Sequence, residues 1–234
     1  MREYSRSKRR QYEKAAAYHR DVTMDDSELE MLKGDYGSLR PDIEARLDEF
    51  RAVWECGSDD SIFRELVFCL LTPQSKARSC WAAVERLHEC NLLNEGSAER
   101  ITAELKGVRF HHTKARRVVD ARRFLPGIKS RLAAFGSSID AREWLVKNVN
   151  GMSYKEASHF LRNIGKGRDL AILDRHILKN LLRFNVIENI VMSITPRRYL
   201  EIEENMRVFC RDIKIPMDHL DMLLWCRETG EIFK

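Results

Sequence analysis

Apolar residues recur at helical spacing along most of the chain. Ile43, Leu47 and Phe50 stand at positions i, i+4 and i+7, which predicts a helix that begins at Pro41. Residues 63–71 are apolar almost all round and predict a buried central helix. Signals for strands are missing, because no Asn-Gly turn joins two alternating runs and the β-branched runs are short. The pattern therefore predicts an all-α fold of about ten helices joined by short loops.

Small polar residues that favour helix N-caps stand just before several of the periodic segments. Thr195 is followed by Pro196, and proline is favoured at the first helical position. The other expected N-caps are Ser97, Thr113, Ser153, Asp174 and Asp218. Each of these residues marks the expected start of a helix.

The composition is that of a soluble globular protein. Of 234 residues, 44% are hydrophobic and 33% are charged, and this length favours one or two domains. The longest apolar runs are far shorter than the ~20 residues of a membrane-spanning helix, and the N-terminus lacks an apolar secretory signal. We therefore expect a cytoplasmic protein without a membrane partner. No heptad seam is visible, so we also expect a monomer.

The cysteines do not form a pattern that binds metal. No two are spaced as C-x-x-C, and no Cys/His cluster has the spacing of a zinc site. Most lie among apolar residues, which favours reduced core cysteines and no metal. The six are Cys56, Cys69, Cys80, Cys90, Cys210 and Cys226.

Basic residues are concentrated in two places. Residues 1–20 contain seven Lys or Arg and two acids, which accounts for the whole net charge of +5. Residues 106–131 contain nine bases and one acid, Asp120. This local excess fits a footprint for nucleic-acid phosphates, and it equally fits a solvated helix face. The composition alone leaves both interpretations open.

The segment of residues 145–165 predicts a helix–hairpin–helix. A helix over about 139–148 leads into a short turn with Gly151, and Ser153 with Glu156 forms a capping box that starts the next helix. The amides of such a turn and of the first helical residues are unpaired donors at the positive end of a helix dipole. They suit a DNA backbone phosphate, and this contact does not depend on base sequence.

Lys155 and Asp174 are candidates for covalent chemistry. Lys155 lies in the first turn of the second hairpin helix, where the helix dipole disfavours the ammonium form and so favours a nucleophilic amine. Asp174 follows an apolar run and opens another helix, where a carboxylate can move protons or stabilise positive charge. Lys155 could instead contact phosphate or be merely exposed, and Asp174 could be a plain N-cap.

Three motifs resemble the helix–hairpin–helix DNA glycosylase superfamily. The string over residues 151–163, followed by Ile-Leu-Asp-Arg-His at 172–176, resembles the hairpin with a catalytic lysine and a downstream aspartate. Residues 70–75 resemble a segment whose glutamine faces DNA. The C-terminus over residues 221–234 resembles the type-2, archaeal-type 8-oxoguanine DNA glycosylase/AP lyases. The resemblance covers residues from about 40 to 234, with the hairpin string its most specific part.

The resemblance implies a fold and a domain organisation. It divides the chain into a glycosylase domain at 36–234, with two interleaved helical subdomains flanking a DNA-binding cleft, and an N-terminal extension at 1–35. This extension is first basic and then acidic, and the sequence does not decide whether it is ordered. Only Cys210 and Cys226 lie in the C-terminal region, so the four-cysteine iron–sulfur cluster of a related branch is excluded there.

The resemblance also implies a mechanism. The damaged base is flipped out of the helix into a pocket, and Lys155 attacks the deoxyribose C1′, displaces 8-oxoguanine and forms a Schiff base. β-Elimination then cuts the strand 3′ to the lesion, while Asp174 stabilises the sugar cation and assists proton transfer. No cofactor is required. A monovalent cation at the hairpin backbone stays open, because Ser153 replaces a glycine that many members of the superfamily have.

Base recognition is expected at the C-terminus. Trp225 is suited to stack on the flipped base, with a core tryptophan as the alternative. The ammonium or the terminal carboxylate of Lys234 could bind the edge of 8-oxoguanine, which differs from guanine by an N7–H donor and an O8 acceptor. Asp218 and Asp221 could accept hydrogen bonds from the base; the alternatives are helix capping for Asp218 and solvent exposure for Asp221.

The remaining contacts are expected to be with the DNA backbone or the reacting lysine. By resemblance, Gln74 faces DNA together with the hairpin residues Gly151 and Ser153. His159 follows Lys155 by four residues and could touch the lysine or DNA, with a packed histidine as the alternative. The expected partner is double-stranded DNA containing 8-oxoguanine, acted on at the nucleoid. The alternatives are a glycosylase for another damaged base, a non-catalytic DNA-binding module, and a helical scaffold that does not bind DNA.

Overall fold

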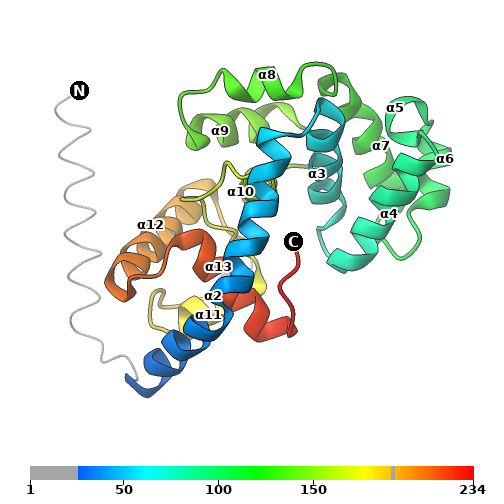
Figure 1. Ribbon diagram of the computed structural model, residues 1–234. Helices are drawn as coiled ribbons and strands as arrows, with labels where there is room; N and C mark the ends of the chain where they lie inside the picture. Colours follow the sequence, from blue (N-terminus) through cyan, green and yellow to red (C-terminus); the bar gives the residue numbers. More distant parts are fainter. Residues whose placement is uncertain (1–25, 191–192) are drawn as a thin grey trace. The chain divides into compact units, whose positions relative to one another are not determined.

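A computed structural model describes residues 26–190 and 193–234 (Figure 1). The described residues form twelve α-helices and one 3-10 helix and contain no strand, which confirms the predicted all-α class. None of the described helices is long and apolar enough to cross a membrane. The helices are α2 (Asp26–Glu55), α3 (Asp59–Leu71), α4 (Ala77–Glu89), α5 (Leu92–Glu95), α6 (Ala98–Glu104), α7 (His111–Ala121), η1 (Arg122–Phe124), α8 (Ile128–Ala133), α9 (Ser138–Asn148), α10 (Tyr154–Asn163), α11 (Arg175–Arg183), α12 (Pro196–Ile213) and α13 (Met217–Thr229).

The helices belong to two compact units, and each unit is formed by two chain segments that are separated in the sequence. Unit 1 contains the described residues up to Glu44 together with Leu173–Phe233, and unit 2 contains Ala45–Ile172 together with Lys234. Helix α2 therefore contributes its first part to unit 1 and its last part to unit 2. The C-terminal residue belongs to unit 2, although the residues just before it belong to unit 1.

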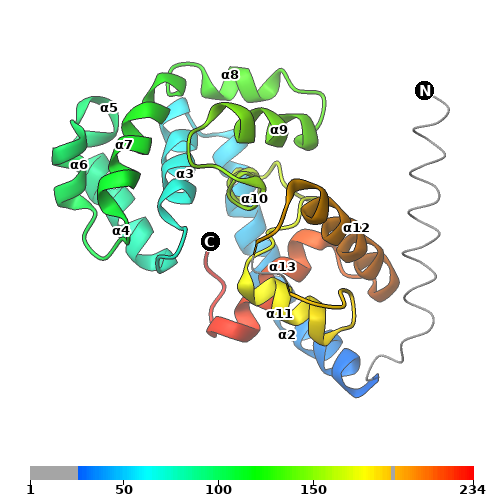
Figure 2. The same ribbon diagram turned by 180° about the vertical axis from the view of Figure 1, so that it is seen from behind.

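Helix α3 is the centre of unit 2, as its apolar sequence predicts. Its residues from Ile62 to Leu71 are buried except Arg64, and the helix packs against α4, α7, α8 and α10. Figures 1 and 2 show α10 next to α3 and α9 from both sides. Each fully buried Leu or Phe contributes roughly 1.5–3 kcal/mol by leaving water. This packing gives the second hairpin helix, α10, a rigid support.

Unit 1 is built on the helices α11, α12 and α13 and the start of α2. Helix α13 packs against α11 and α12, and Phe184 stacks on Phe209 with 5.7 Å between the ring centroids. The first part of α2 is attached by polar contacts. The guanidinium of Arg183 pairs with the carboxylate of Glu28, and Arg227 Nε lies 3.2 Å from an oxygen of Asp35. These pairs supplement the apolar core of the unit.

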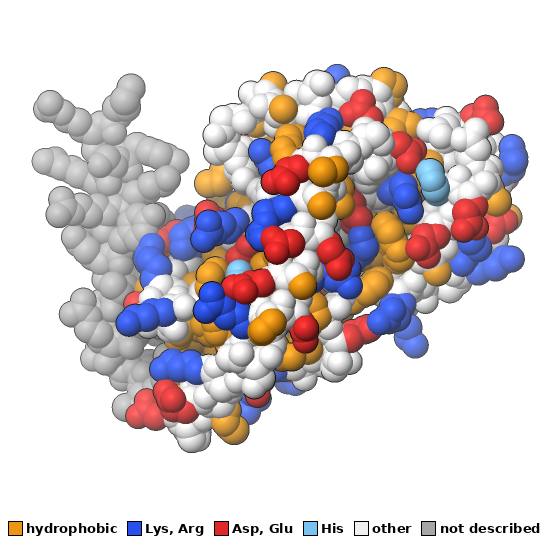
Figure 3. Space-filling model, viewed as in Figure 1, with side chains coloured by type: hydrophobic (Ala, Val, Ile, Leu, Met, Phe, Trp, Pro, Cys, Tyr) orange, Lys and Arg blue, Asp and Glu red, His pale blue; other side chains and the backbone are white. Residues whose placement is uncertain are grey.

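Charged side chains of both signs are interspersed along α2 on the face drawn in Figure 3. They include ion pairs within the helix, such as Lys33 with Glu30 at 2.9 Å and Arg40 with Glu44 at 2.8 Å. Exposed pairs of this kind contribute only about 0.3–0.5 kcal/mol each. Helix α2 carries nine acids and four bases, so it has no positive excess that would favour DNA.

The predicted start of the first helix is wrong. Helix α2 begins at Asp26, so Pro41 lies inside it, and residues 26–35 of the expected N-terminal extension form its first turns. Proline removes one helical hydrogen bond. Pro41 and Gly37 are both exposed, so the freed carbonyl of Gly37 remains accessible to water, while Leu32 and Ile43 are buried on either side and hold the helix together. Residues 1–25 lie outside the described residues.

Four of the six expected N-caps are confirmed, and two are wrong. Ser97, Ser153, Asp174 and Thr195 each cap the helix that follows. Helix α7 begins before Thr113, because Phe110 is the N-cap in a left-handed conformation. Helix α13 begins after Pro216, which places Asp218 in the first turn of that helix. In both cases the loop geometry, and not a capping side chain, determines where the helix begins.

Candidate active site

The predicted hairpin is present between α9 and α10. Gly151 has φ of +90°, a conformation that residues with a Cβ rarely adopt. A Cβ at this position would lie 2.4 Å from the Cδ of Arg117, so the side chain of this α7 residue packs closely against the turn. The hairpin therefore requires glycine both for its backbone conformation and for its contact with α7.

Two of the hairpin amides are already paired within the protein. The amide of Ser153 donates to the carboxylate of Glu156 at 3.3 Å, as a capping box requires, and the amide of Met152 donates to the carbonyl of Val149 at 3.1 Å. The predicted capping box is therefore confirmed, whereas the expectation of unpaired turn amides is wrong for Met152. A DNA contact of Gly151 or Ser153 stays a prediction.

Lys155 lies in the first turn of α10, directly after the capped turn. Its Nζ is 3.6 Å from Oε1 of Glu156, and its side chain is 21% exposed. The rest of α10 is held in place by burial, because every residue from Glu156 to Asn163 is buried. The lysine is thus a partly accessible amine on a rigid base.

Asp174 is the N-cap of α11 in unit 1. Its Oδ1 accepts hydrogen bonds from the amides of His176 at 2.8 Å and Ile177 at 2.9 Å. The buried run Leu170–Leu173 leads into it, as expected. The capping interpretation is confirmed, and its two hydrogen bonds use one carboxylate oxygen. A role of the other oxygen in catalysis is compatible with this geometry and stays a prediction.

The C-terminal residue occupies a cluster of side chains in unit 2. The ammonium of Lys234 pairs with the carboxylate of Glu65 on α3 and lies 3.6 Å from the ring centroid of Trp81 on α4. The second oxygen of Glu65 accepts from the side-chain amide of Asn163 at 3.0 Å. Phe68 lies beside them, with its centroid 5.8 Å from the ammonium. We call this group of residues the lysine cluster.

The environment of the lysine cluster is nearly dry. The side chains of Lys234 and Glu65 are 11% and 4% exposed. Burial lowers the pKa of the Lys234 amine from its ordinary value, and the negative charge of Glu65 opposes this shift. The aromatic faces and the carboxylate together compensate for the water that the ammonium has lost.

Sequence reasoning did not identify Glu65 or Trp81. One available signal was that Glu65 is the only acid in the apolar run 63–71, and an acid in a buried helix needs a partner. Its actual partner is 169 residues away in the sequence, which no local pattern indicates. Trp81 lies in an ordinary amphipathic helix and has no comparable signal.

His159 is buried, which supports the packed alternative. Its ring contacts Phe68 edge to face, with 5.5 Å between the centroids. Burial lowers its pKa well below the ordinary value of 6.5, and the nearby charges of Arg162 and Lys155 lower it further. The imidazole is therefore neutral at neutral pH. Contact of His159 with DNA stays a prediction.

The other expected site residues have diverse surroundings. Gln74 is exposed in the turn after α3, with φ of +55°. Trp225 is half-buried in unit 1 and contacts His176 edge to face at 5.3 Å. Asp218 and Asp221 are both buried, so the solvent alternative for Asp221 is wrong. The oxygen of Asp218 accepts from the amide of His219 at 3.0 Å. Base recognition by these residues stays a prediction.

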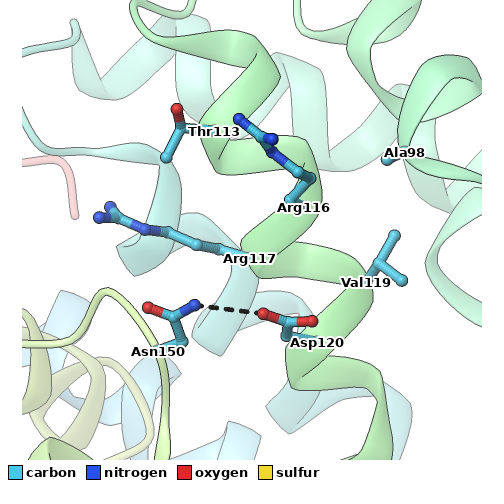
Figure 4. A pocket seen from close by; sticks show the side chains of 7 residues that line it. All are labelled: Ala98, Thr113, Arg116, Arg117, Val119, Asp120 and Asn150. Carbon is cyan, nitrogen blue, oxygen red and sulfur yellow. Dashed lines mark hydrogen bonds between the residues drawn. The ribbon is translucent and has the colours of Figure 1, made fainter.

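Some of the basic residues between 106 and 131 have structural partners. Four of the nine, Lys114, Arg122, Arg123 and Lys129, donate to backbone carbonyls. Two others line an open pocket of about 360 Å³ between α7 and the hairpin turn (Figure 4). In this pocket Arg116 and Arg117 come from α7, and Asn150 of the turn donates to Asp120 at 3.2 Å. The pocket is a candidate contact for a backbone phosphate.

Among residues 26–190 and 193–234, no group of three or more His, Cys, Asp or Glu side chains is arranged to hold a metal ion. All six cysteines are free. Cys69, Cys80 and Cys210 are buried, as the core interpretation predicts, but the interpretation is wrong for Cys56 and Cys90, which are exposed, and Cys226 is half-buried.

Comparisons with known proteins agree with this arrangement. The model of a family described as 8-oxoguanine DNA glycosylase matches residues 43–215. An 8-oxoguanine DNA glycosylase/AP lyase of Fusobacterium nucleatum is 46% identical over 204 residues, which covers 85% of this chain and 94% of that protein. A crystal structure of the 8-oxoguanine DNA glycosylase of Thermotoga maritima matches with a TM-score of 0.82 at 31% identity, over 89% of this chain and 99% of the other. A Methanocaldococcus jannaschii 8-oxoguanine glycosylase/lyase, solved in complex with 15mer DNA containing 8-oxoguanine, matches with a TM-score of 0.80 at 34% identity, over 87% of this chain and 100% of the other.

Proposed function

The chain belongs to the 8-oxoguanine DNA glycosylase family, and on this premise we propose that it excises 8-oxoguanine from DNA and cleaves the strand 3′ to the resulting abasic site. One observation carries the proposal: Lys155 is a partly accessible amine in the first turn of α10, directly behind a capped hairpin turn. A hairpin that only binds DNA has no need for a nucleophile at this position.

In the proposed reaction the neutral amine of Lys155 attacks C1′ of the damaged nucleotide. The C1′–N9 bond breaks, and its electron pair leaves with the base, which takes up a proton. The C1′–O4′ bond then opens, O4′ takes up a proton and a protonated imine forms between the lysine and the sugar. Loss of a C2′ proton expels the 3′ phosphate and cuts the strand. All of these steps use side chains, so the proposal requires no cofactor.

Asp174 is proposed to stabilise the positive charge that develops on the sugar and to assist proton transfer. Its capping bonds fix the orientation of the carboxylate before substrate binds, and such preorganisation makes electrostatic stabilisation effective. Lys155 and Asp174 are thus the proposed catalytic pair.

Recognition of 8-oxoguanine is proposed to involve Lys234. Its ammonium is already paired with Glu65, which leaves the terminal carboxylate as the acceptor for the N7–H that guanine lacks. Trp225 is the proposed stacking partner of the flipped base, and Asp218 and Asp221 are proposed acceptors. A site that is built to bind one extra N–H discriminates strongly against a base without it.

Contacts with duplex DNA are proposed for the hairpin turn at Gly151 and Ser153, for Gln74, and for the pocket lined by Arg116 and Arg117. The arginines supply positive charge for backbone phosphates, and such contacts do not depend on the base sequence of the DNA. We propose that the protein acts as a monomer on nucleoid DNA, because one copy of the chain contains both proposed catalytic residues.

Borohydride trapping tests the proposal. The protein is mixed with a duplex containing one 8-oxoguanine, and borohydride reduces any imine to a stable protein–DNA adduct. We expect an adduct with the wild-type protein and none with Lys155→Gln. Lys147→Gln is the matched control, because Lys147 is an exposed lysine on the preceding helix α9. An adduct only with an abasic duplex would indicate another damaged base, and DNA binding without any adduct would indicate a non-catalytic module.

A further inference from the structure

Two neighbouring loops of unit 2 each contain a residue with a Cβ in the left-handed conformation. Gln74 has φ of +55° in the loop of residues 72–76, which we call the Gln74 loop. Phe110 has φ of +57° in the loop of residues 105–110, which we call the Phe110 loop. Both residues are exposed, and Phe110 is 56% exposed. Such conformations persist only where the surroundings enforce them, and they are concentrated at functional sites.

The side chain of Lys114 holds the Gln74 loop. It is 2% exposed, and its Nζ donates to the carbonyls of Leu71 and Pro73, both at 2.7 Å, and to Oγ of Ser75 at 3.0 Å. An ammonium has three donors, and here one binds the last residue of α3 and two bind this loop, on both sides of Gln74. A lysine is almost never fully buried unless it is paired, and the partners of Lys114 are these three oxygens.

The same lysine also joins the two loops. Its backbone amide donates to the carbonyl of Phe110 at 3.0 Å, which starts helix α7. Oγ of Ser75, which accepts from the Lys114 ammonium, also accepts from the amide of Arg109 at 3.0 Å. The Gln74 loop and the Phe110 loop are therefore connected both through the Lys114 side chain and through the Ser75 hydroxyl.

We propose that Lys114 is a positioning residue that holds the exposed Gln74 and Phe110 side chains as one rigid pair for contact with the DNA duplex around the lesion. The inference rests on the proposed function, because it assigns the two loop tips to the DNA substrate. Neither the lysine nor the serine touches DNA. Their effect is to remove the freedom that the two loops would otherwise lose on binding.

The test compares Lys114→Met with Lys33→Met. Methionine keeps most of the volume of lysine and removes the three donors, and Lys33 is an exposed lysine on α2, outside every proposed DNA contact. The first measurement is equilibrium binding to a duplex that contains a tetrahydrofuran abasic-site analogue. The second is borohydride trapping on abasic sites in duplex and in single-stranded DNA. Single-stranded DNA requires no insertion of the loops into a stack of base pairs.

We expect Lys114→Met to slow trapping on duplex DNA by about tenfold to a hundredfold, which is the usual effect of a small misplacement of positioning groups. Trapping on single-stranded DNA should stay within about twofold of wild type, and duplex affinity should fall, whereas Lys33→Met should leave both unchanged. Equal losses on both substrates, or no loss on the duplex, would overturn the proposal.

Ser75→Ala covers the case in which Lys114→Met does not fold. It removes one acceptor of the network, so we expect a loss of about threefold to tenfold on duplex DNA and none on single strands. An unchanged duplex rate would overturn the proposal. If the wild-type protein is not trapped on any substrate, the proposed catalysis fails, and duplex affinity alone then decides whether Lys114 positions the loops.

Discussion

Replacing Glu65 by glutamine should separate excision of 8-oxoguanine from cleavage at abasic sites. The carboxylate uses both of its oxygens, one for the ammonium of Lys234 and one for the amide of Asn163. A glutamine has one acceptor oxygen. If that oxygen stays with Asn163, the NH₂ group faces the ammonium of Lys234, and two donors oppose each other in a nearly dry cluster.

The magnitude follows from the burial of the pair. Breaking a buried ion pair by removing one charge costs about 3–5 kcal/mol, because the remaining charge has no counterion. Lys234 is the last residue and can escape this cost by moving into water, so we expect detachment of the lysine and not unfolding. The contact with Trp81 retains about 2 kcal/mol of attraction. A shift of about 3 kcal/mol lowers the ratio of docked to detached lysine roughly a hundredfold.

The assay is single-turnover cleavage of two duplexes, one with 8-oxoguanine and one with an abasic site. Glu65→Gln and deletion of Lys234 should each lower 8-oxoguanine excision by one to two orders of magnitude and leave abasic-site cleavage unchanged. The double variant should be no worse than the deletion, since both changes remove the same contact. Glu104→Gln is the control, because Glu104 pairs with Arg86 at a half-buried site elsewhere in unit 2. Equal losses on both substrates, or an additive double variant, would refute the reasoning.

Three further outcomes can be checked by denaturation. Gly151→Ala should lower the free energy of unfolding by about 1–3 kcal/mol, because φ is +90° and the new Cβ displaces Arg117; an unchanged urea midpoint would contradict this. The pKa of His159 is well below 6.5 in the folded protein, so below pH 6.5 the unfolded chain binds more protons than the folded one. The free energy of unfolding should therefore fall with decreasing pH by up to about 1.4 kcal/mol per pH unit, and His159→Phe should lack this pH dependence. Burial lowers the pKa of Lys114 from 10.5 to about 8, so between pH 8 and 10.5 the unfolded chain again binds more protons than the folded one. The free energy of unfolding of the wild type, relative to that of Lys114→Met, should therefore increase with pH. A difference between the two proteins that stays constant from pH 8 to 10 would exclude the shift.

Local signals predicted the hairpin accurately because its structure is determined locally. Ser153 and Glu156 form their capping box within one turn, and Asp174 caps α11 with its own carboxylate. The start of α2 could not be predicted in this way. Leu32 and Ile43 are buried on either side of Pro41, and this tertiary packing outweighs the local tendency of proline to begin a helix.

The candidate site was only partly predictable for a related reason. Lys155 lies in a motif whose position along the chain fixes its position in the fold. The lysine cluster instead depends on the contact of Lys234 with Glu65 and Trp81, which come from three distant segments. The C-terminal motif indicated Lys234 through its resemblance to the 8-oxoguanine DNA glycosylases. Only the structure shows which side chains contact its ammonium.

The basic stretch 106–131 shows how charge counting overestimates a DNA-binding surface. Helices leave carbonyls unpaired at their C-terminal ends, where the helix dipole also favours cations. Lys114 binds the carbonyl of Leu71 at the end of α3, and Arg123 binds that of Asn148 at the end of α9.

The same rule applies to two further bases of the stretch. Arg122 binds the carbonyls of Leu92, Leu93 and Gly96 around α5, and Lys129 binds that of Gly57 just after α2. Four of the nine bases therefore stabilise ends of helices. The charge available to DNA phosphates lies in the remaining five, and among these Arg116 and Arg117 stand next to the hairpin. Loss of either arginine should weaken DNA binding and its dependence on salt, whereas loss of Arg122 should lower stability and leave the salt dependence unchanged.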